Sequence, residues 1–128
     1  MLGYTTVGTN NFDKAIKFYD VLLAELGGKR MMEEDNYVGW AVDMAAGGMF
    51  SIMKPHDGKA ASVGNGTMFA FAATSTDLVD KFYAKAIELG ATCEGKPGPR
   101  GESGFYAGYF RDLDGNKLNA FFMPGMEG

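Results

Sequence analysis

Residues 104–123 read GFYAGYFRDLDGNKLNAFFM, and this stretch decides the fold. Two runs rich in aromatic residues flank the turn DLDGN at residues 112–116. Aromatic residues favour the pleated, half-buried surface of a sheet, and Asp, Asn and Gly favour tight turns. Asp-Gly between two such runs is a strong hairpin signal, so we expect two antiparallel strands that close the fold.

The composition is that of a globular protein with many turns. Glycine accounts for 19 of the 128 residues, about twice the usual share, which favours short strands. A net charge of −4 argues against a nucleic-acid partner, and no apolar run reaches the ~20 residues of a membrane span. The N-terminus lacks signal-peptide features, and a single cysteine excludes an internal disulfide framework. We therefore expect a cytoplasmic protein that binds neither nucleic acid nor membrane.

The expected elements repeat once along the chain. A strand, a helix and three strands are expected over residues 2–8, 12–26, 29–34, 37–44 and 49–54. The same order is expected again over residues 67–73, 78–89, 91–95, 105–110 and 118–122. Lys17-Phe18-Tyr19 also matches Lys81-Phe82-Tyr83 at an offset of 82 − 18 = 64. We infer a duplicated βαβββ module within one domain, with module one at about 1–57, a connection at about 58–65 and module two at about 66–128.

These features resemble the vicinal oxygen chelate superfamily, which includes glyoxalase I, the bleomycin-resistance proteins and the extradiol dioxygenases. The resemblance rests on Phe18-Tyr19, on the pairs Leu26-Gly27 and Leu89-Gly90 that end the helices, and on the DLDGN turn, which is similar to the family's Asp-Pro-Asp-Gly-Asn. It covers nearly the whole chain. It implies an α+β fold in which two tandem βαβββ modules form a half-barrel around a shared cavity.

The resemblance also implies four metal-ligand positions, which carry His or Glu in the metal-dependent members. Counted from the motifs, these positions are Tyr4, Ser51, Thr67 and Asn119. A phenol, two hydroxyls and an amide lack the imidazole, carboxylate or thiolate that catalytic metals require. We therefore expect no metal and no cofactor, and the set argues against glyoxalase and dioxygenase activity.

Candidate ligand-binding residues are polar, aromatic or basic. We expect Tyr4, Thr67 and Asn119 to face one another across the cavity. Aromatic residues suggest a cradle for a planar or cationic ligand, with ordinary core packing as the alternative explanation. Arg100 lies on a glycine-rich loop suited to an anionic ligand, with a solvated charge as the alternative. The full candidate set is Tyr4, Trp40, Thr67, Arg100, Tyr106, Asn119 and Phe121.

Two single residues are weaker candidates. His56 is the only histidine and lies in a turn-like connection, where a solvated residue is favoured over a base or a ligand. Cys93 has no histidine near it in sequence and is expected to be a small packed residue rather than a nucleophile.

Three functions stay open at this point. The first is a metal-independent member that binds an unknown small organic molecule, either sequestering it or acting on it. The second is a metal-dependent lyase, similar to lactoylglutathione lyase, or a dioxygenase whose ligands lie elsewhere. The third is an interaction module with a vestigial pocket. We expect a homodimer in each case, because two half-covered sheets leave surface to bury.

Overall fold

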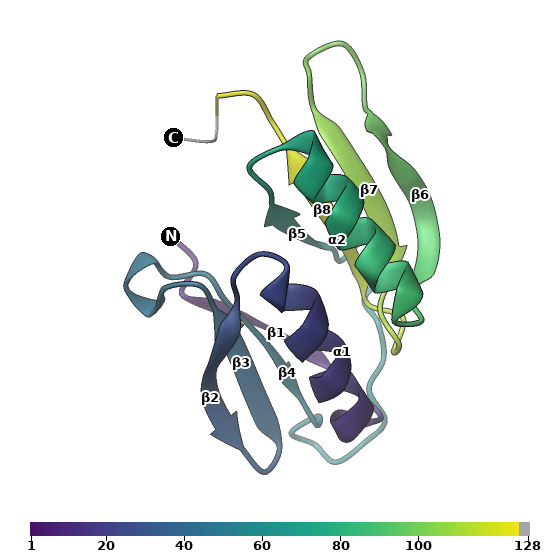
Figure 1. Cartoon of the computed structure of the whole chain (residues 1–128). Helices are drawn as coiled ribbons and strands as arrows, with labels where there is room; N and C mark the ends of the chain where they lie inside the picture. Colours follow the sequence, from purple (N-terminus) through teal and green to yellow (C-terminus); the bar gives the residue numbers. More distant parts are fainter. Residues whose placement is uncertain (126–128) are drawn as a thin grey trace. The chain divides into compact units, whose positions relative to one another are not determined.

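The computed structural model describes residues 1–125, and the chain divides into two compact units, Met1–Val63 and Gly64–Gly128 (Figure 1). The first unit contains β1 (Tyr4–Gly8), α1 (Phe12–Ala24), β2 (Lys29–Glu34), β3 (Tyr37–Ala41), the short 3-10 helix η1 (Met44–Ala46) and β4 (Met49–Met53). The second contains β5 (Phe69–Ala72), α2 (Thr76–Glu88), β6 (Thr92–Pro99), β7 (Tyr106–Arg111) and β8 (Lys117–Phe122).

The two units have the same topology. Their sheets have the strand orders β1-β4-β3-β2 and β5-β8-β7-β6. In each sheet the first and last strands of the module pair in parallel, and the remaining neighbours are antiparallel. The expected pair of βαβββ modules is therefore confirmed, while the closure of the modules around a shared cavity stays a prediction.

Local sequence explains where both helices begin and end. The Asn11 side chain accepts a hydrogen bond from the Lys14 N–H at 3.1 Å, and Ser75 does the same for Leu78 at 3.1 Å. These caps satisfy backbone donors that have no partner within the helix. Gly27 then adopts a φ of 83°, a left-handed conformation that costs glycine little and ends α1.

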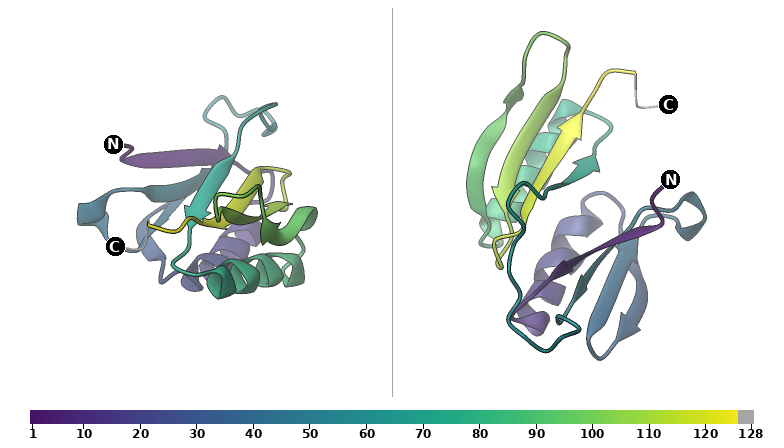
Figure 2. Two further views of the ribbon diagram at one scale, coloured as in Figure 1. Left: turned by 90° about the horizontal axis from the view of Figure 1, so that it is seen from above. Right: turned by 180° about the vertical axis from the view of Figure 1, so that it is seen from behind.

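Each helix packs against one face of its own sheet through aromatic rings. The Tyr19 ring lies 5.7 Å from Trp40 and 5.0 Å from Phe50. In the second module, the Phe82 ring lies 5.4 Å from Phe71 and 6.0 Å from Phe110. The right-hand view of Figure 2 shows each helix behind the strands of its own module. We call the opposite face, which the module's own helix does not cover, the open face of that sheet.

Several strands differ from the expected boundaries: β1 begins at Tyr4 rather than at residue 2, and β3 ends at Ala41 rather than at residue 44, where η1 begins. β5 begins at Phe69 rather than Thr67, because Thr67 closes a turn in which its N–H donates to the Gly64 carbonyl at 3.1 Å. β6 continues to Pro99, beyond the expected end at Gly95. Proline has no N–H to donate, but β6 is an edge strand and its register with β7 shifts in this stretch, so the ladder tolerates it.

Neither of the helices described within residues 1–125 has the length and apolar character that crossing a bilayer requires.

Candidate ligand-binding pocket

Strand alternation separates the first module's side chains into two sets. Trp40 and Phe50 are register partners, and both contact Tyr19, so they face α1. The next pair along the same two strands, Gly39 and Ser51, must then lie on the open face. Alternate residues of these strands therefore point away from α1 and form the open face.

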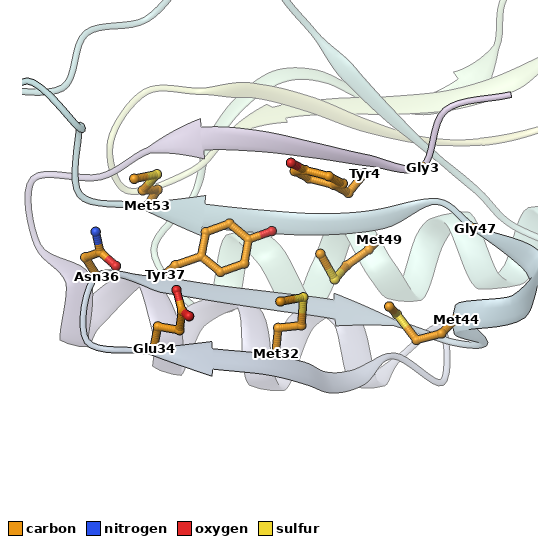
Figure 3. A pocket seen from close by; sticks show the side chains of 10 residues that line it. All are labelled: Gly3, Tyr4, Met32, Glu34, Asn36, Tyr37, Met44, Gly47, Met49 and Met53. Atoms are coloured by element: carbon orange, nitrogen blue, oxygen red, sulfur yellow. The ribbon is translucent and has the colours of Figure 1, made fainter.

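A pocket of about 500 Å³ lies on this open face (Figure 3). Its volume falls in the range of known small-molecule sites, ~300–1,000 Å³. Every strand of the module and η1 contribute to it, because neighbouring strands align their outward side chains. The lining residues are Gly3, Tyr4, Met32, Glu34, Asn36, Tyr37, Met44, Gly47, Met49 and Met53.

Met49 lines the pocket, and its side chain packs closely over Gly39. A Cβ atom at Gly39 would lie 2.7 Å from the Met49 Sδ and 2.9 Å from its Cε, closer than real contacts allow. The Met49 side chain therefore lies in space that only glycine leaves free. Any side chain at residue 39 would push the Met49 thioether up into the pocket.

The lining is apolar over most of its length and polar at one end. Figure 3 shows Met44 and Met49 towards one end, Met32 near the middle, and Glu34, Asn36 and Met53 towards the other end. Methionine is flexible and polarisable, so this lining can adapt to ligands of different shape. Among the described lining residues, Glu34 is the only one with a charged side chain.

Two of the aromatic residues expected to bind a ligand face the helices instead. The Trp40 Nε1–H donates to Asp20 Oδ1 at 2.9 Å, and the Tyr106 hydroxyl donates to Asp80 Oδ1 at 2.7 Å. Asp20 and Asp80 both lie on helices. The hydrogen bond to Asp80 raises the pKa of Tyr106. The structure thus places Trp40 and Tyr106 in the packing between helix and sheet and away from the open faces.

The strand register within each sheet agrees with the motif count at three of the four counted metal positions and differs at Thr67. Thr6 pairs with Ser51 in the first module, and Ala70 pairs with Asn119 in the second. Two residues before Ala70 on the chain is Met68, so the strand register makes Met68, and not Thr67, the counterpart of Tyr4. The offset of 64 between the helices gives this answer directly, since 4 + 64 = 68.

These positions do not fit a catalytic metal. Ser51 is fully buried, and its hydroxyl bonds the Thr5 carbonyl at 2.6 Å and the Thr6 hydroxyl at 2.9 Å. The other positions are the Tyr4 phenol, the Asn119 amide, and either the Met68 thioether or the Thr67 hydroxyl. The set contains no imidazole and no carboxylate. Within residues 1–125, no three His, Cys, Asp or Glu side chains cluster, and His56 lies in an exposed turn.

The open face of the second module is aromatic and basic. Tyr109 lies opposite Asn119, and its ring centroid is 5.3 Å from the Arg100 guanidinium carbon and 5.6 Å from Lys117 Nζ. Arg100 also donates to the carbonyls of Lys96 and Ala107, so it is held against the module. Phe121 shares this face with Asn119 and contacts the Phe105 ring at 5.7 Å.

Asn119 is the most unusual of these residues. It is 2% exposed, and its Oδ1 has no hydrogen-bond partner among the described residues. A buried acceptor without a partner costs free energy, and such groups concentrate where function requires them.

Sequence reasoning missed the pocket's methionines and Glu34 as a group. The available signal was the spacing of Met49, Ser51 and Met53, which alternate along one strand. That spacing indicates a shared face, but it does not say whether the face is covered by a helix.

Comparisons with known proteins agree with this fold. The model of a family described as Glyoxalase/Bleomycin resistance protein/Dioxygenase superfamily matches residues 1–120. A search of curated proteins found no match. A solved glyoxalase/bleomycin resistance protein from Albidiferax ferrireducens T118 is 37% identical, with 97% of this chain and 99% of that chain covered and a TM-score of 0.87.

Two more distant structures share the fold. A lactoylglutathione lyase from Agrobacterium tumefaciens is 20% identical over 95% of this chain and 92% of its own, with a TM-score of 0.71. The fosfomycin resistance protein FosX from Listeria monocytogenes is 17% identical over 99% of this chain and 96% of its own, with a TM-score of 0.72.

Proposed function

The chain belongs to the glyoxalase/bleomycin resistance protein/dioxygenase superfamily, and from this premise we propose that it is a metal-independent member that binds a small organic molecule. The pocket on the open face of the first module carries this proposal. Its volume suits a small molecule, and its lining combines a large apolar surface with few polar groups, the usual character of such sites.

The metal-independent part rests on the donor chemistry. The family positions hold a phenol, a satisfied hydroxyl and an amide, which are poor ligands for the metals that the family's enzymes use. The lyase and the fosfomycin resistance protein share only the fold at their levels of identity, so neither activity transfers to this chain.

Further parts of the proposal concern the second module and the setting. We propose Asn119, Phe121 and Arg100 as ligand-binding residues there, supported by the unpartnered Asn119 oxygen. Thr67, in its exposed turn, is retained as a further candidate. A cytoplasmic location and a homodimer are also proposed.

The experiment uses protein labelled with ¹³C at the methionine methyl groups. A library of small aromatic, cationic and carboxylate compounds is screened for NMR shifts and for a rise in melting temperature. A ligand at about 100 times its Kd stabilises the fold by ~2.7 kcal/mol, which for this length raises Tm by roughly 5–15 °C. The methyl signals of Met32, Met44, Met49 and Met53 are expected to move together.

Gly39→Ala supplies the decisive variant, because it drives Met49 into the pocket without requiring a left-handed backbone. Gly98→Ala is the matched control, since a Cβ there meets nothing within 4 Å. Binding is expected to weaken in the first variant and to persist in the second. Compounds that bind Gly39→Ala as tightly as the wild type would show that the binding site lies elsewhere. A rise in Tm with zinc, nickel or manganese alone would overturn metal independence.

A further inference from the structure

We propose that the pocket of the first module selects organic cations, with Glu34 as the counter-ion. This inference rests on the proposed function and adds the chemical class of the ligand. The class is an aromatic or aliphatic body that carries an ammonium group, either protonated or quaternary.

The charge distribution supplies the first argument. The described pocket lining contains the Glu34 carboxylate and no lysine or arginine. The neighbouring Glu33 lies on the other face of β2 and pairs with Arg30 at 2.7 Å, whereas Glu34 forms no salt bridge within residues 1–125. The carboxylate that faces the pocket is therefore the one that remains available to a ligand.

The apolar lining supplies the second argument. The Tyr4 and Tyr37 rings both project into the pocket, and Tyr37 lies between Glu34 and the methionine end (Figure 3). Aromatic faces attract cations, and recognition of ammonium groups by aromatic rings is an established mode of binding. Thioethers add polarisable surface for the body of the ligand.

The arrangement also gives the ligand a direction. The ammonium group would lie beside Glu34 and Tyr37, and the apolar body would extend over Met49 towards Met32 and Met44. An anion has no basic partner in this lining and would be repelled by Glu34. The open face of the second module has the opposite character, because Arg100 and Lys117 flank Tyr109 there.

The test compares three probes of similar size, namely benzylammonium, benzyl alcohol and benzoate, at neutral pH and low salt. Their Kd values are read from the methyl shifts of the four pocket methionines. Because Glu34 is solvent-exposed, its contribution is modest, and we expect benzylammonium to bind about three- to tenfold more tightly than benzyl alcohol. Benzoate is expected to bind more weakly than benzyl alcohol.

Two charge variants separate a local effect from a general one. Glu34→Gln and Glu33→Gln change the net charge equally but act on opposite faces of β2. The preference for benzylammonium is expected to vanish in Glu34→Gln and to persist in Glu33→Gln.

Three outcomes distinguish the proposals. Equal loss of preference in both variants would show an effect of net charge and overturn the inference. Equal or tighter binding of benzyl alcohol or benzoate to the wild type would also overturn it, while small-molecule binding would stand. If neither the library nor the three probes shift the four methyl signals, the pocket does not bind small molecules and the proposed function is overturned.

Discussion

The Trp40 indole N–H donates to the Asp20 carboxylate at 2.9 Å, joining β3 to α1. The same carboxylate accepts from the Arg30 Nε–H at 2.8 Å, so one acid on the helix connects two strands. The hydrogen bond from Arg30 is the main cause that lowers the pKa of Asp20, with a smaller contribution from Trp40 and an opposing one from burial. This acid therefore contributes to stability in a pH-dependent way.

We expect Asp20→Asn to reduce stability at neutral pH but not in strong acid. A carboxylate whose pKa is lowered by folding stabilises the folded state above its unfolded value, 3.8, and loses that contribution as pH falls through the folded value. The Asp20 side chain is 32% exposed, so solvent screening limits the effect to ~1 kcal/mol. Urea unfolding of both proteins from pH 7 to about 2 should show the difference constant above about pH 5 and shrinking below it. A difference that grows in acid would contradict this account.

Asp112 is expected to hold the closing hairpin together. Its Oδ1 accepts from the Asp114 and Asn116 N–H groups, both at 2.9 Å, and its Oδ2 accepts from Asn116 Nδ2 at 3.0 Å. Hydrogen bonds to a charged group contribute ~1.5–3 kcal/mol, so Asp112→Ala should lower the free energy of unfolding by at least ~2 kcal/mol. Leu113→Ala, at an exposed position of the same turn, is the control and should change it little.

Asn119→Leu should stabilise the free protein. The substitution removes a buried oxygen that has no partner among the described residues, and a leucine of similar size fits a strand. We expect the free energy of unfolding to rise by ~1 kcal/mol, measured with urea in the absence of any compound. Asn116→Leu makes the same chemical change where the amide is bonded, and should destabilise. Destabilisation by Asn119→Leu would show that its oxygen is satisfied in solution.

A homodimer is the expected state in solution. Each sheet has a face that its own helix does not cover, and Leu2 and Val42 are both 65% exposed. Burying such surface between two copies is favourable. Light scattering at micromolar concentration should give twice the chain mass of 13.8 kDa. A monomer under these conditions would contradict the prediction.

The elements were predictable from sequence because their signals are local. Asn11, Ser75 and the DLDGN turn act through neighbours a few residues away, and the observed caps and hairpin agree with them. The internal repeat was equally visible, because Phe18 and Phe82 occupy equivalent buried places on their helices.

The site was less predictable because it depends on which face of a strand the helix covers. Alternation groups residues by face but does not name the covered face, so Trp40 and Tyr106 were assigned to a ligand when each faces a helix. A slip of one residue has the same effect, since it replaces Met68 by Thr67 and reverses the side-chain direction. The covered face depends on long-range packing, which no short motif encodes, whereas the offset of 64 between the helices already indicates Met68.

The separation of the two faces has a consequence for protein engineering. In β4, Phe50 and Ile52 belong to the core, Met49 is buried and also lines the pocket, and the half-buried Met53 lines the pocket. A mutagenesis library confined to pocket positions such as Met53 and Tyr37 would therefore vary recognition without touching the residues that make the module fold. The pocket-facing residues can thus be varied for new ligands, while the helix-facing residues of the same strands maintain the fold.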